Sequence, residues 1–316
     1  MRVIVVGMGV QGPKRRAVAG DDVVACVDPV GEADYKDVRD VPIDSYDAAL
    51  LCVPDAAKID LITHLLEAGK HILVEKPLFA ANSDQLLALD QLTRQKNVVL
   101  YTAYNHRFEP HFVRMRDCVE EGRLGSIYAC RMFYGNGTAR LVRNSVWRDS
   151  GAGVLPDLGS HLLDTALFWF GDLSDYTARV VSARAFENRA FDHISFILEK
   201  SGAPVLHFET SLLSWRNHFY CDVQAEKGSA HISSLCKWGP SSFTLRTRYL
   251  PSGRPDEETV TLVEPDPTWR AEYDHFCKIC ADPGAHDHGN TLGGVWLNDT
   301  LGLLQDQALG NKEGVA

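Results

Sequence analysis

The sequence has no excess of basic charge. Its 316 residues include 32 lysines and arginines but 42 aspartates and glutamates, so the formal net charge is −10. The one short basic cluster, Lys14-Arg15-Arg16, is too small to form the cationic surface that nucleic acids and anionic membranes require. We therefore expect neither as a partner. We interpret the cluster as a solvated helix face, although its place after a glycine-rich turn leaves a phosphate contact open.

The sequence also lacks long apolar runs and a cysteine framework. No stretch approaches the roughly 18 apolar residues of a membrane-spanning helix. The glycines between Gly7 and Gly12 interrupt the apolar start of the chain before a signal-peptide core could form. Eight cysteines without framework spacing predict reduced thiols and a cytoplasmic location. The lone C-x-x-C of Cys277 and Cys280 has no second pair, so we expect neither a metal site nor redox chemistry there.

What the sequence does contain is a pattern typical of dinucleotide binding. The apolar segment 2–6 is followed by Gly7-Met8-Gly9-Val10-Gln11-Gly12 and then by helical spacing, which is the context that a G-x-G-x-x-G motif requires. In this motif Gly7 permits the tight turn, Gly9 lets a pyrophosphate approach the backbone, and Gly12 lets helix and strand pack closely. The helix N-terminus would then offer N–H groups to the phosphates.

Asp28 ends the next apolar segment, 23–28. A carboxylate at this place binds the ribose hydroxyls of NAD and repels the 2′-phosphate of NADP. The alternative is a turn aspartate before Pro29. Because the glycine motif lies upstream, we favour the ribose contact and predict NAD as the cofactor rather than NADP.

The order of the remaining patterns predicts two domains. Strand patterns at 46–54, 71–76 and 98–104 alternate with helical ones at 56–68 and 83–95, which is typical of a parallel, doubly wound sheet. From 177 to 265 the strand patterns follow one another without long helices, which predicts an open, mainly antiparallel sheet. We therefore expect an α/β Rossmann domain over 1–103 and an α+β domain over 104–316 for substrate binding and oligomerisation.

The expected second sheet would leave one face uncovered. Its strand patterns need cover on both sides, and the helices predicted near 110–121, 269–280 and 291–309 can cover only one. An uncovered apolar face implies a partner. We expect a homodimer or homotetramer built sheet against sheet.

Four segments of the chain resemble the glucose–fructose oxidoreductase, inositol dehydrogenase and rhizopine-catabolism (Gfo/Idh/MocA) dehydrogenases. They are the glycine motif, Ala68-Gly-Lys-His-Ile-Leu-Val-Glu-Lys-Pro77, Tyr104-Asn-His-Arg-Phe-Glu-Pro110 and Gly151-Ala-Gly-Val-Leu-Pro-Asp157-Leu-Gly-Ser-His161. The resemblance implies a cis bond between Lys76 and Pro77, the only kind of peptide in which cis is cheap. The family usually has a histidine near the start of the helix after Pro54, where this chain has Lys58.

The resemblance also implies an activity and a set of site residues. The activity is NAD(H)-dependent hydride transfer between nicotinamide and a secondary hydroxyl or keto carbon of a sugar, cyclitol or sugar-nucleotide derivative. The expected catalytic residues are Lys76, Asp157 and His161. The expected cofactor-binding residues are Gly7, Gly9, Val10, Gln11, Gly12, Asp28, Pro54, Glu75, Lys76 and Asn105. Candidates for substrate contacts are Tyr134, Asp157 and Arg148, because a Trp-Arg pair (here Trp147 and Arg148) tends to lie near the substrate in this family.

The spacing and the chemistry of Asp157 and His161 also indicate a catalytic pair, apart from the resemblance. Residues four apart on a helix share a face, so we expect the two side chains to point the same way. An imidazole titrates near neutrality, as a base for a hydroxyl proton must. The alternative is a helix-capping aspartate and a core histidine.

Two other functions stay open at this point. One is an NAD-retaining enzyme that performs redox-assisted elimination or lyase chemistry. The other is a non-catalytic dinucleotide-binding protein, which loss of Lys76 or His161 would have indicated; both residues are present.

Overall fold

The computed structural model describes residues 1–145 and 148–313, which form two compact units. Unit 1 comprises Met1–Asn105 and Thr268–Asp299, and unit 2 comprises His106–Pro267 and the residues from Thr300 on. The first boundary thus lies two residues beyond the predicted one. The return of 268–299 to unit 1 corrects the assignment of all of 104–316 to a second domain.

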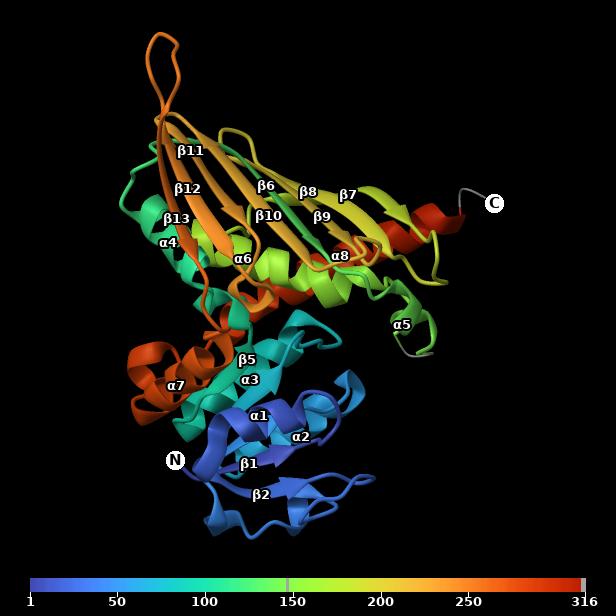
Figure 1. Cartoon of the computed structure of the whole chain (residues 1–316). Coiled ribbons are helices and arrows are strands. Elements are labelled where there is room, and N and C mark those ends of the chain that lie inside the picture. The colour runs from blue at the N-terminus through green and yellow to red at the C-terminus, as the bar shows by residue number, and fades with distance from the viewer. Residues whose placement is uncertain (146–147, 314–316) are drawn as a thin grey trace. The chain divides into compact units, whose positions relative to one another are not determined.

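Unit 1 is built on a five-stranded parallel sheet in the order β2-β1-β3-β4-β5. Figure 1 labels β1, β2 and β5 of this sheet. The strands are β1 (Val3–Val6), β2 (Val23–Val27), β3 (Ala48–Leu51), β4 (His71–Glu75) and β5 (Leu100–Ala103). The helices are α1 (Gly12–Ala19), α2 (Asp55–Glu67), α3 (Ser83–Lys96), α7 (Thr268–Ala281) and the first part of α8 (Thr291–Glu313). The strand order reverses at β1, and doubly wound sheets bind ligands beyond the strand carboxyl ends at such a point.

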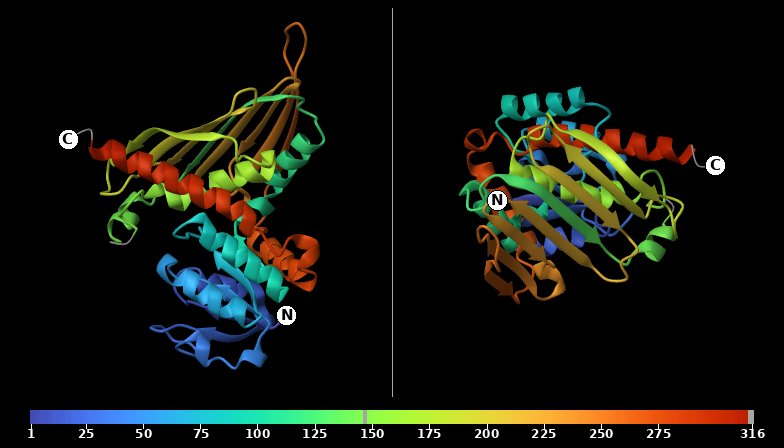
Figure 2. Two further views of the ribbon diagram at one scale, coloured as in Figure 1. Left: turned by 180° about the vertical axis from the view of Figure 1, so that it is seen from behind. Right: turned by 90° about the horizontal axis from the view of Figure 1, so that it is seen from above.

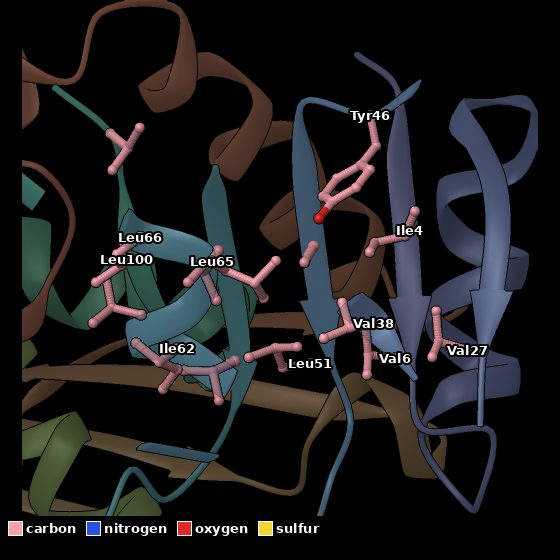
Figure 3. Packing of buried hydrophobic residues seen from close by; sticks show 14 of the residues in the cluster. Ile4, Val6, Val27, Val38, Tyr46, Leu51, Ile62, Leu65, Leu66 and Leu100 are labelled. Atoms are coloured by element: carbon pink, nitrogen blue, oxygen red, sulfur yellow. The ribbon is translucent and has the colours of Figure 1, made fainter. Parts of the chain in front are cut away.

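The core of unit 1 lies between the sheet and its helices. Alternate residues of the strands meet the apolar face of α2, so that Ile62, Leu65 and Leu66 are fully buried near strand residues such as Leu51 and Leu100 (Figure 3). Burying side chains of this size stabilises the fold by about 1.5–3 kcal/mol each. This packing fixes the strand ends, where the expected cofactor-binding residues lie.

Contacts far apart in sequence explain why 268–299 joins unit 1. Arg15 of α1 is buried and binds Glu272 of α7 at 2.7 Å. The side chain of Asn290 accepts the backbone N–H of Thr102 at 2.8 Å and donates to its carbonyl at 2.9 Å. Gly289 (φ 122°) lies so close to β5 that a Cβ would overlap the Leu100 carbonyl oxygen. No local pattern in the sequence predicts these contacts.

Unit 2 is built on an eight-stranded sheet in the order β13-β12-β11-β10-β6-β9-β8-β7. All neighbours are antiparallel except β6 and β9, which confirms the predicted, mainly antiparallel sheet. The strands are β6 (Ile127–Gly135), β7 (Thr177–Arg184), β8 (His193–Glu199), β9 (Val205–Ser211), β10 (His218–Ala225), β11 (Gly228–Ser233), β12 (Ser241–Thr247) and β13 (Asp256–Leu262).

Helices cover one face of this sheet. They are α4 (Pro110–Glu120), α6 (Ser160–Phe170) and the later part of α8, and a short helix, α5 (Ala139–Arg143), lies beyond the end of β6 (Figure 1). Strand alternation sorts the side chains: on β10 Phe219, Cys221 and Val223 are buried, whereas Tyr220 is 40% exposed. The view in the right panel of Figure 2 shows the other face of the sheet bare of helices. Within 1–145 and 148–313, no helix is long and apolar enough to span a bilayer.

Candidate functional site

The glycine motif forms a tight turn between β1 and α1. Gly7 has a φ of 91°, and a Cβ there would lie 2.5 Å from the Cys52 carbonyl oxygen. A Cβ on Gly12 would overlap the Gly7 carbonyl oxygen, whereas one on Gly9 would meet nothing within 4 Å. The turn thus requires glycine at two positions for packing and leaves open space at the third, which fits a pyrophosphate lying against the backbone.

The remaining motif residues lie at the mouth of this turn. Val10 is 80% exposed, and Gln11 is the N-cap residue of α1. Pro54 is the N-cap residue of α2, directly beyond the carboxyl end of β3. All three therefore lie at the strand ends where a dinucleotide is expected.

Asp28 follows β2 and is tied to the glycine turn. Its Oδ2 accepts the N–H of Met8 at 2.6 Å, and its Oδ1 accepts the N–H groups of Val30 at 2.9 Å and Gly31 at 2.6 Å. These backbone hydrogen bonds, the one from Gly31 most of all, lower the pKa of Asp28. The carboxylate is therefore charged at neutral pH beside the turn.

Arg15 is not part of a solvated helix face, which corrects the interpretation of the basic cluster. Its guanidinium is 1% exposed, donates to Glu75 and Glu272 at 2.7 Å each, and lies 4.4 Å from the ring centre of Trp269. Arg15 is therefore committed to two carboxylates rather than available to a phosphate. The expected cofactor contact Glu75 is committed in the same way.

Lys58 holds the end of β4. It is 2% exposed, donates to the carbonyl oxygens of Glu75 at 2.7 Å and Pro77 at 2.6 Å, and pairs with Asp55 at 2.7 Å. Burial lowers the pKa of Lys58, and Asp55 opposes this shift. The two carbonyls flank Lys76, so Lys58 fixes the backbone on both sides of the expected catalytic lysine. The predicted cis bond between Lys76 and Pro77 is confirmed.

Asn105 lies after β5 and contacts the returning segment. Its side chain donates to the Thr268 hydroxyl at 2.8 Å and is 9% exposed. Cys277 and Cys280 are free thiols in α7, and burial raises the pKa of both. Neither is therefore a ready nucleophile.

Asp157 and His161 lie in unit 2, but the backbone between them is not a regular α-helix. Residues Leu155–Gly159 form a π turn that leads into α6. This corrects the expected i, i+4 geometry, because a π turn takes more residues per turn than an α-helix. The bond that closes the turn runs from the N–H of Ser160 to the carbonyl oxygen of Leu155, five residues back. Single π turns occur frequently at functional sites.

The loop before the π turn is held against the loop that connects β7 to β8. Gly153 (φ 54°) packs so closely on the 186–192 segment that a Cβ would overlap the Phe191 carbonyl oxygen. Val154 donates its N–H to that carbonyl at 2.9 Å. Asp157 then pairs with the expected substrate contact Arg148 at 3.4 Å, both side chains being about a third exposed. Trp147 lies outside the described residues.

His161 lies in an aromatic cluster. Its ring stacks on that of His106 at a centroid distance of 4.1 Å, and the Tyr134 ring lies edge-on at 5.8 Å. All three residues are buried. The structure thus brings together His161 and Tyr134 of the predicted set and adds His106, which lies in the Tyr104–Pro110 segment but had no role assigned.

Lys237 and Trp238 complete the cluster. The Lys237 Nζ lies 3.3 Å from His106 Nε2 and 3.4 Å from the Tyr134 hydroxyl, and 4.8 Å from the ring centre of Trp238. Sequence reasoning missed both residues, since no motif surrounds them and only sheet pairing brings them to β6. Of the expected catalytic residues, Lys76 belongs to unit 1, whereas Asp157 and His161 belong to unit 2.

Comparison with family models identifies the class of protein. A model described as "Oxidoreductase family, NAD-binding Rossmann fold" matches residues 1–104, and the GFO/IDH/MocA C-terminal domain matches residues 112–231. Together the two models match most of the chain. The chain belongs to the Gfo/Idh/MocA family of oxidoreductases, and the first part of unit 1 is its NAD-binding Rossmann fold.

Individual relatives match part of their own length. Inositol 2-dehydrogenase of Rhizobium meliloti is 29% identical over 188 residues, which is 58% of this chain and 56% of that protein. An uncharacterized oxidoreductase of Schizosaccharomyces pombe is 34% identical over 138 residues, or 43% of this chain and 37% of that protein. The aligned part of this chain thus spans from about a third to a little over half of the curated relatives that it matches.

Solved structures show the same fold over nearly the whole chain. Levoglucosan dehydrogenase in complex with NADH has a TM-score of 0.81 at 19% identity and covers 98% of this chain and 97% of its own. The UDP-N-acetylglucosamine 3-dehydrogenase GnnA of Acidithiobacillus ferrooxidans has a TM-score of 0.79 at 16% identity, with 97% of each chain covered. At these identities the likeness establishes the fold alone.

Proposed function

We propose that this protein is an NAD(H)-dependent dehydrogenase that oxidises a secondary hydroxyl group of a sugar, cyclitol or sugar-nucleotide derivative, or reduces the corresponding ketone. The observation that carries this proposal is the placement of His161, a buried imidazole that follows a pinned glycine-rich loop and has Asp157 on the preceding turn. Relatives named inositol 2-dehydrogenase and levoglucosan dehydrogenase support the substrate class.

The residues of unit 1 fit a dinucleotide. The open space at Gly9 admits the pyrophosphate, and the charged Asp28 suits ribose hydroxyls. Gly7, Gly12, Val10, Gln11 and Pro54 shape the surrounding strand ends, and Asn105 borders them after β5. When bound, nicotinamide supplies the hydride acceptor or donor.

The remaining steps belong to side chains. A hydride leaves a carbinol carbon readily only if the hydroxyl proton is taken at the same time. His161 takes this proton during oxidation and returns it during reduction. Lys76 donates a hydrogen bond to the reacting oxygen, and Asp157, with Arg148 beside it, orients a neighbouring hydroxyl. Tyr134 borders the same space.

The test is turnover of a panel of sugars, cyclitols and sugar nucleotides, measured as NADH absorbance. Lys76→Met and His161→Ala should each lose about 10²–10⁴-fold in turnover, the usual share of a positioned acid–base group, while NADH binding measured by fluorescence changes little. Lys278→Met and His286→Ala, in α7 and the loop after it, are matched controls and should retain activity. Unchanged turnover in both site variants contradicts the mechanism, and turnover without net NADH would indicate lyase chemistry instead.

We also propose a cytoplasmic homodimer or homotetramer. The eight free cysteines support a reducing compartment, and the bare face of the unit 2 sheet supports self-association. Asp222, Tyr220 and Arg131 lie on that face.

A further inference from the structure

Lys237 lies in a short segment whose backbone is fixed from behind. It is the middle residue of the 3₁₀ turn Cys236–Trp238, which connects β11 to β12. Glu109 at the start of α4 accepts the N–H of Cys236 at 3.0 Å and its thiol at 2.8 Å. Both of these residues are buried. The ammonium group of Lys237 is therefore presented from a rigid base and not from a loose loop.

Aromatic rings and two long polar contacts surround this ammonium. It is half-buried between the rings of Trp238 and Tyr134, at 4.8 and 5.7 Å from their centres. Its polar neighbours, His106 Nε2 and the Tyr134 hydroxyl, lie at the long distances of 3.3 and 3.4 Å. Within the part of the chain that the structure describes, Lys237 forms no ion pair with a carboxylate. The acidic group nearest to its turn, Glu109, uses both oxygens on Cys236; burial raises its pKa, and the charge of Lys237 opposes this shift without forming a direct ion pair.

A half-buried ammonium without a directly paired carboxylate is unfavourable, because withdrawal from water penalises an unpaired charge. An ammonium has three N–H donors, and two of them face uncharged acceptors. The aromatic rings stabilise the cation only in part, by about 0.5–2 kcal/mol. A bound anion would supply both the missing charge and the third acceptor.

The same cluster contains the expected acid–base group. Lys237 contacts His106, and His106 stacks on His161 at 4.1 Å. An anion on Lys237 would therefore belong to the molecule whose hydroxyl His161 serves. One compact cation matches one negative charge, and this favours a carboxylate over a phosphate, for which bidentate arginines are the common ligands.

We propose that Lys237 binds a carboxylate group of the substrate, so that the enzyme acts on a sugar acid such as a uronic or aldonic acid. This rests on the dehydrogenase function proposed above and narrows its substrate class. In this cluster, Trp238 and Tyr134 exclude water around the pair, and His106 lies between the anion site and His161.

Matched ligand pairs test the proposal. The NAD-loaded protein is titrated with glucuronate, galacturonate and gluconate, each against its neutral counterpart (glucose, galactose and glucitol), and with glucose 6-phosphate. Binding is followed by thermal shift and turnover by NADH absorbance. We expect at least one acid to bind and react about 10–100-fold better than its neutral counterpart, the usual range for a hydrogen bond to a charged group.

The variants separate charge from structure. Lys237→Gln should abolish the preference for the acid, so that the acid binds and reacts no better than its neutral counterpart, and Lys237→Arg should keep part of the preference. Lys227→Gln, in the exposed turn between β10 and β11, is the matched control and should behave as the unaltered protein.

Each contrary outcome has a distinct meaning. Acid and neutral ligands that bind equally, or an acid preference that survives Lys237→Gln, would overturn the carboxylate site. A preference for glucose 6-phosphate that Lys237→Gln removes would also overturn it, in favour of a phosphate site. Acid binding that depends on Lys237, with no NADH formed from any ligand of the panel, would support the anion site and count against the dehydrogenase function.

Discussion

At the scale of single residues, Asp28 shows how a local hydrogen-bond pattern sets a charge. Three backbone N–H groups hold the carboxylate, and the resulting pKa lies below the usual value for aspartate. A group with a lowered folded-state pKa stabilises the protein above its unfolded pKa, and this contribution is lost as the pH falls toward the folded value. At neutral pH the charge is fully present beside the glycine turn.

We therefore expect NAD to bind more tightly than NADP. A 2′-phosphate would meet the like charge of Asp28, a juxtaposition that costs several kcal/mol. Asp28→Ser should narrow the difference in affinity, measured by fluorescence titration with both nucleotides. Asp34→Ser is the control, because Asp34 lies in the same loop but accepts the N–H of Cys26, at 2.8 Å, whereas Asp28 accepts that of Met8 in the turn. Tighter NADP binding by the unaltered protein would refute the assignment.

The roles of residues within motifs could be predicted from the sequence. The roles of residues that are placed by contacts with distant parts of the chain could not. The glycines of the turn have roles that follow from their spacing alone. Arg15, by contrast, was interpreted as solvated, because its carboxylate partners lie 60 and 257 positions away. Lys237 was missed for the same reason: sheet pairing, which no local pattern encodes, carries its turn to His106 and Tyr134.

At the scale of elements, a side-chain contact from α2 to the end of β4 fixes the position of the expected catalytic lysine, Lys76. Lys58 of α2 donates to the two carbonyl groups that flank Lys76. The sequence revealed only that a lysine stood where the family usually has a histidine. The contact itself depends on how α2 packs against β4, which a helical pattern does not define.

We expect Lys58→Met to impair turnover more than folding. Removal of a buried charge offsets much of the loss of its hydrogen bonds, so the free energy of unfolding should change by no more than about 1–3 kcal/mol. Release of the backbone around Lys76 should lower kcat at least about tenfold, since a misplaced catalytic group loses most of its effect. NADH affinity should stay within about threefold of normal.

Lys70→Met provides the matched control for this clamp. Lys70 also donates to a backbone carbonyl of unit 1, that of Tyr46 at 2.8 Å, and lies over the Tyr46 ring. Its loss should affect stability without lowering kcat. Equal loss of kcat in the two variants would show that Lys58 has only a structural part. Full turnover in Lys58→Met would exclude the clamp altogether.

The start of the helix that contains His161 shows that residue spacing does not predict the exact helix type. The spacing of Asp157 and His161 predicted a shared α-helical face. The π turn at Leu155–Gly159 has more residues per turn than an α-helix, so the two residues do not have α-helical spacing. A single residue more per turn leaves the apolar pattern of the segment nearly unchanged. The existence of the helix could therefore be predicted, but not the direction of the Asp157 side chain.

At the scale of the whole chain, the order of patterns predicted both sheets and nearly every strand. It did not predict that 268–299 returns to unit 1, since the helical pattern of α7 is compatible with either unit. The deciding contacts are the ion pair of Glu272 with Arg15 and the side-chain bonds of Asn290 to β5. These contacts join residues that are far apart in the sequence, so no local sequence pattern predicts them.

The uncovered face of the unit 2 sheet indicates how the chain assembles. On its central strands Tyr220 stacks on Phe133 at 5.5 Å, and beside them His231 contacts Asp222 at 3.0 Å. We expect this face to bind a second copy of the chain. Tyr220→Glu should therefore yield a 35.0 kDa monomer by light scattering, whereas Tyr249→Glu, in the loop between β12 and β13, should leave the oligomer intact. A monomeric unaltered protein at micromolar concentration would contradict the prediction.

Acid should weaken the same assembly. Burial lowers the pKa of His231; Asp222 and Glu257 act to raise it, and Arg246 acts to lower it. A histidine with a lowered pKa favours the folded, buried form above its ordinary pKa of about 6.5, and this contribution is lost as the pH falls from there toward the lowered value. Since a partner sheet would bury the ring further, its pKa would fall again on assembly, and the dissociation constant should rise as the pH falls below the already lowered pKa of His231 in the monomer. His231→Gln should remove most of this dependence, and a dissociation constant that does not change with pH in the unaltered protein would place His231 outside the interface.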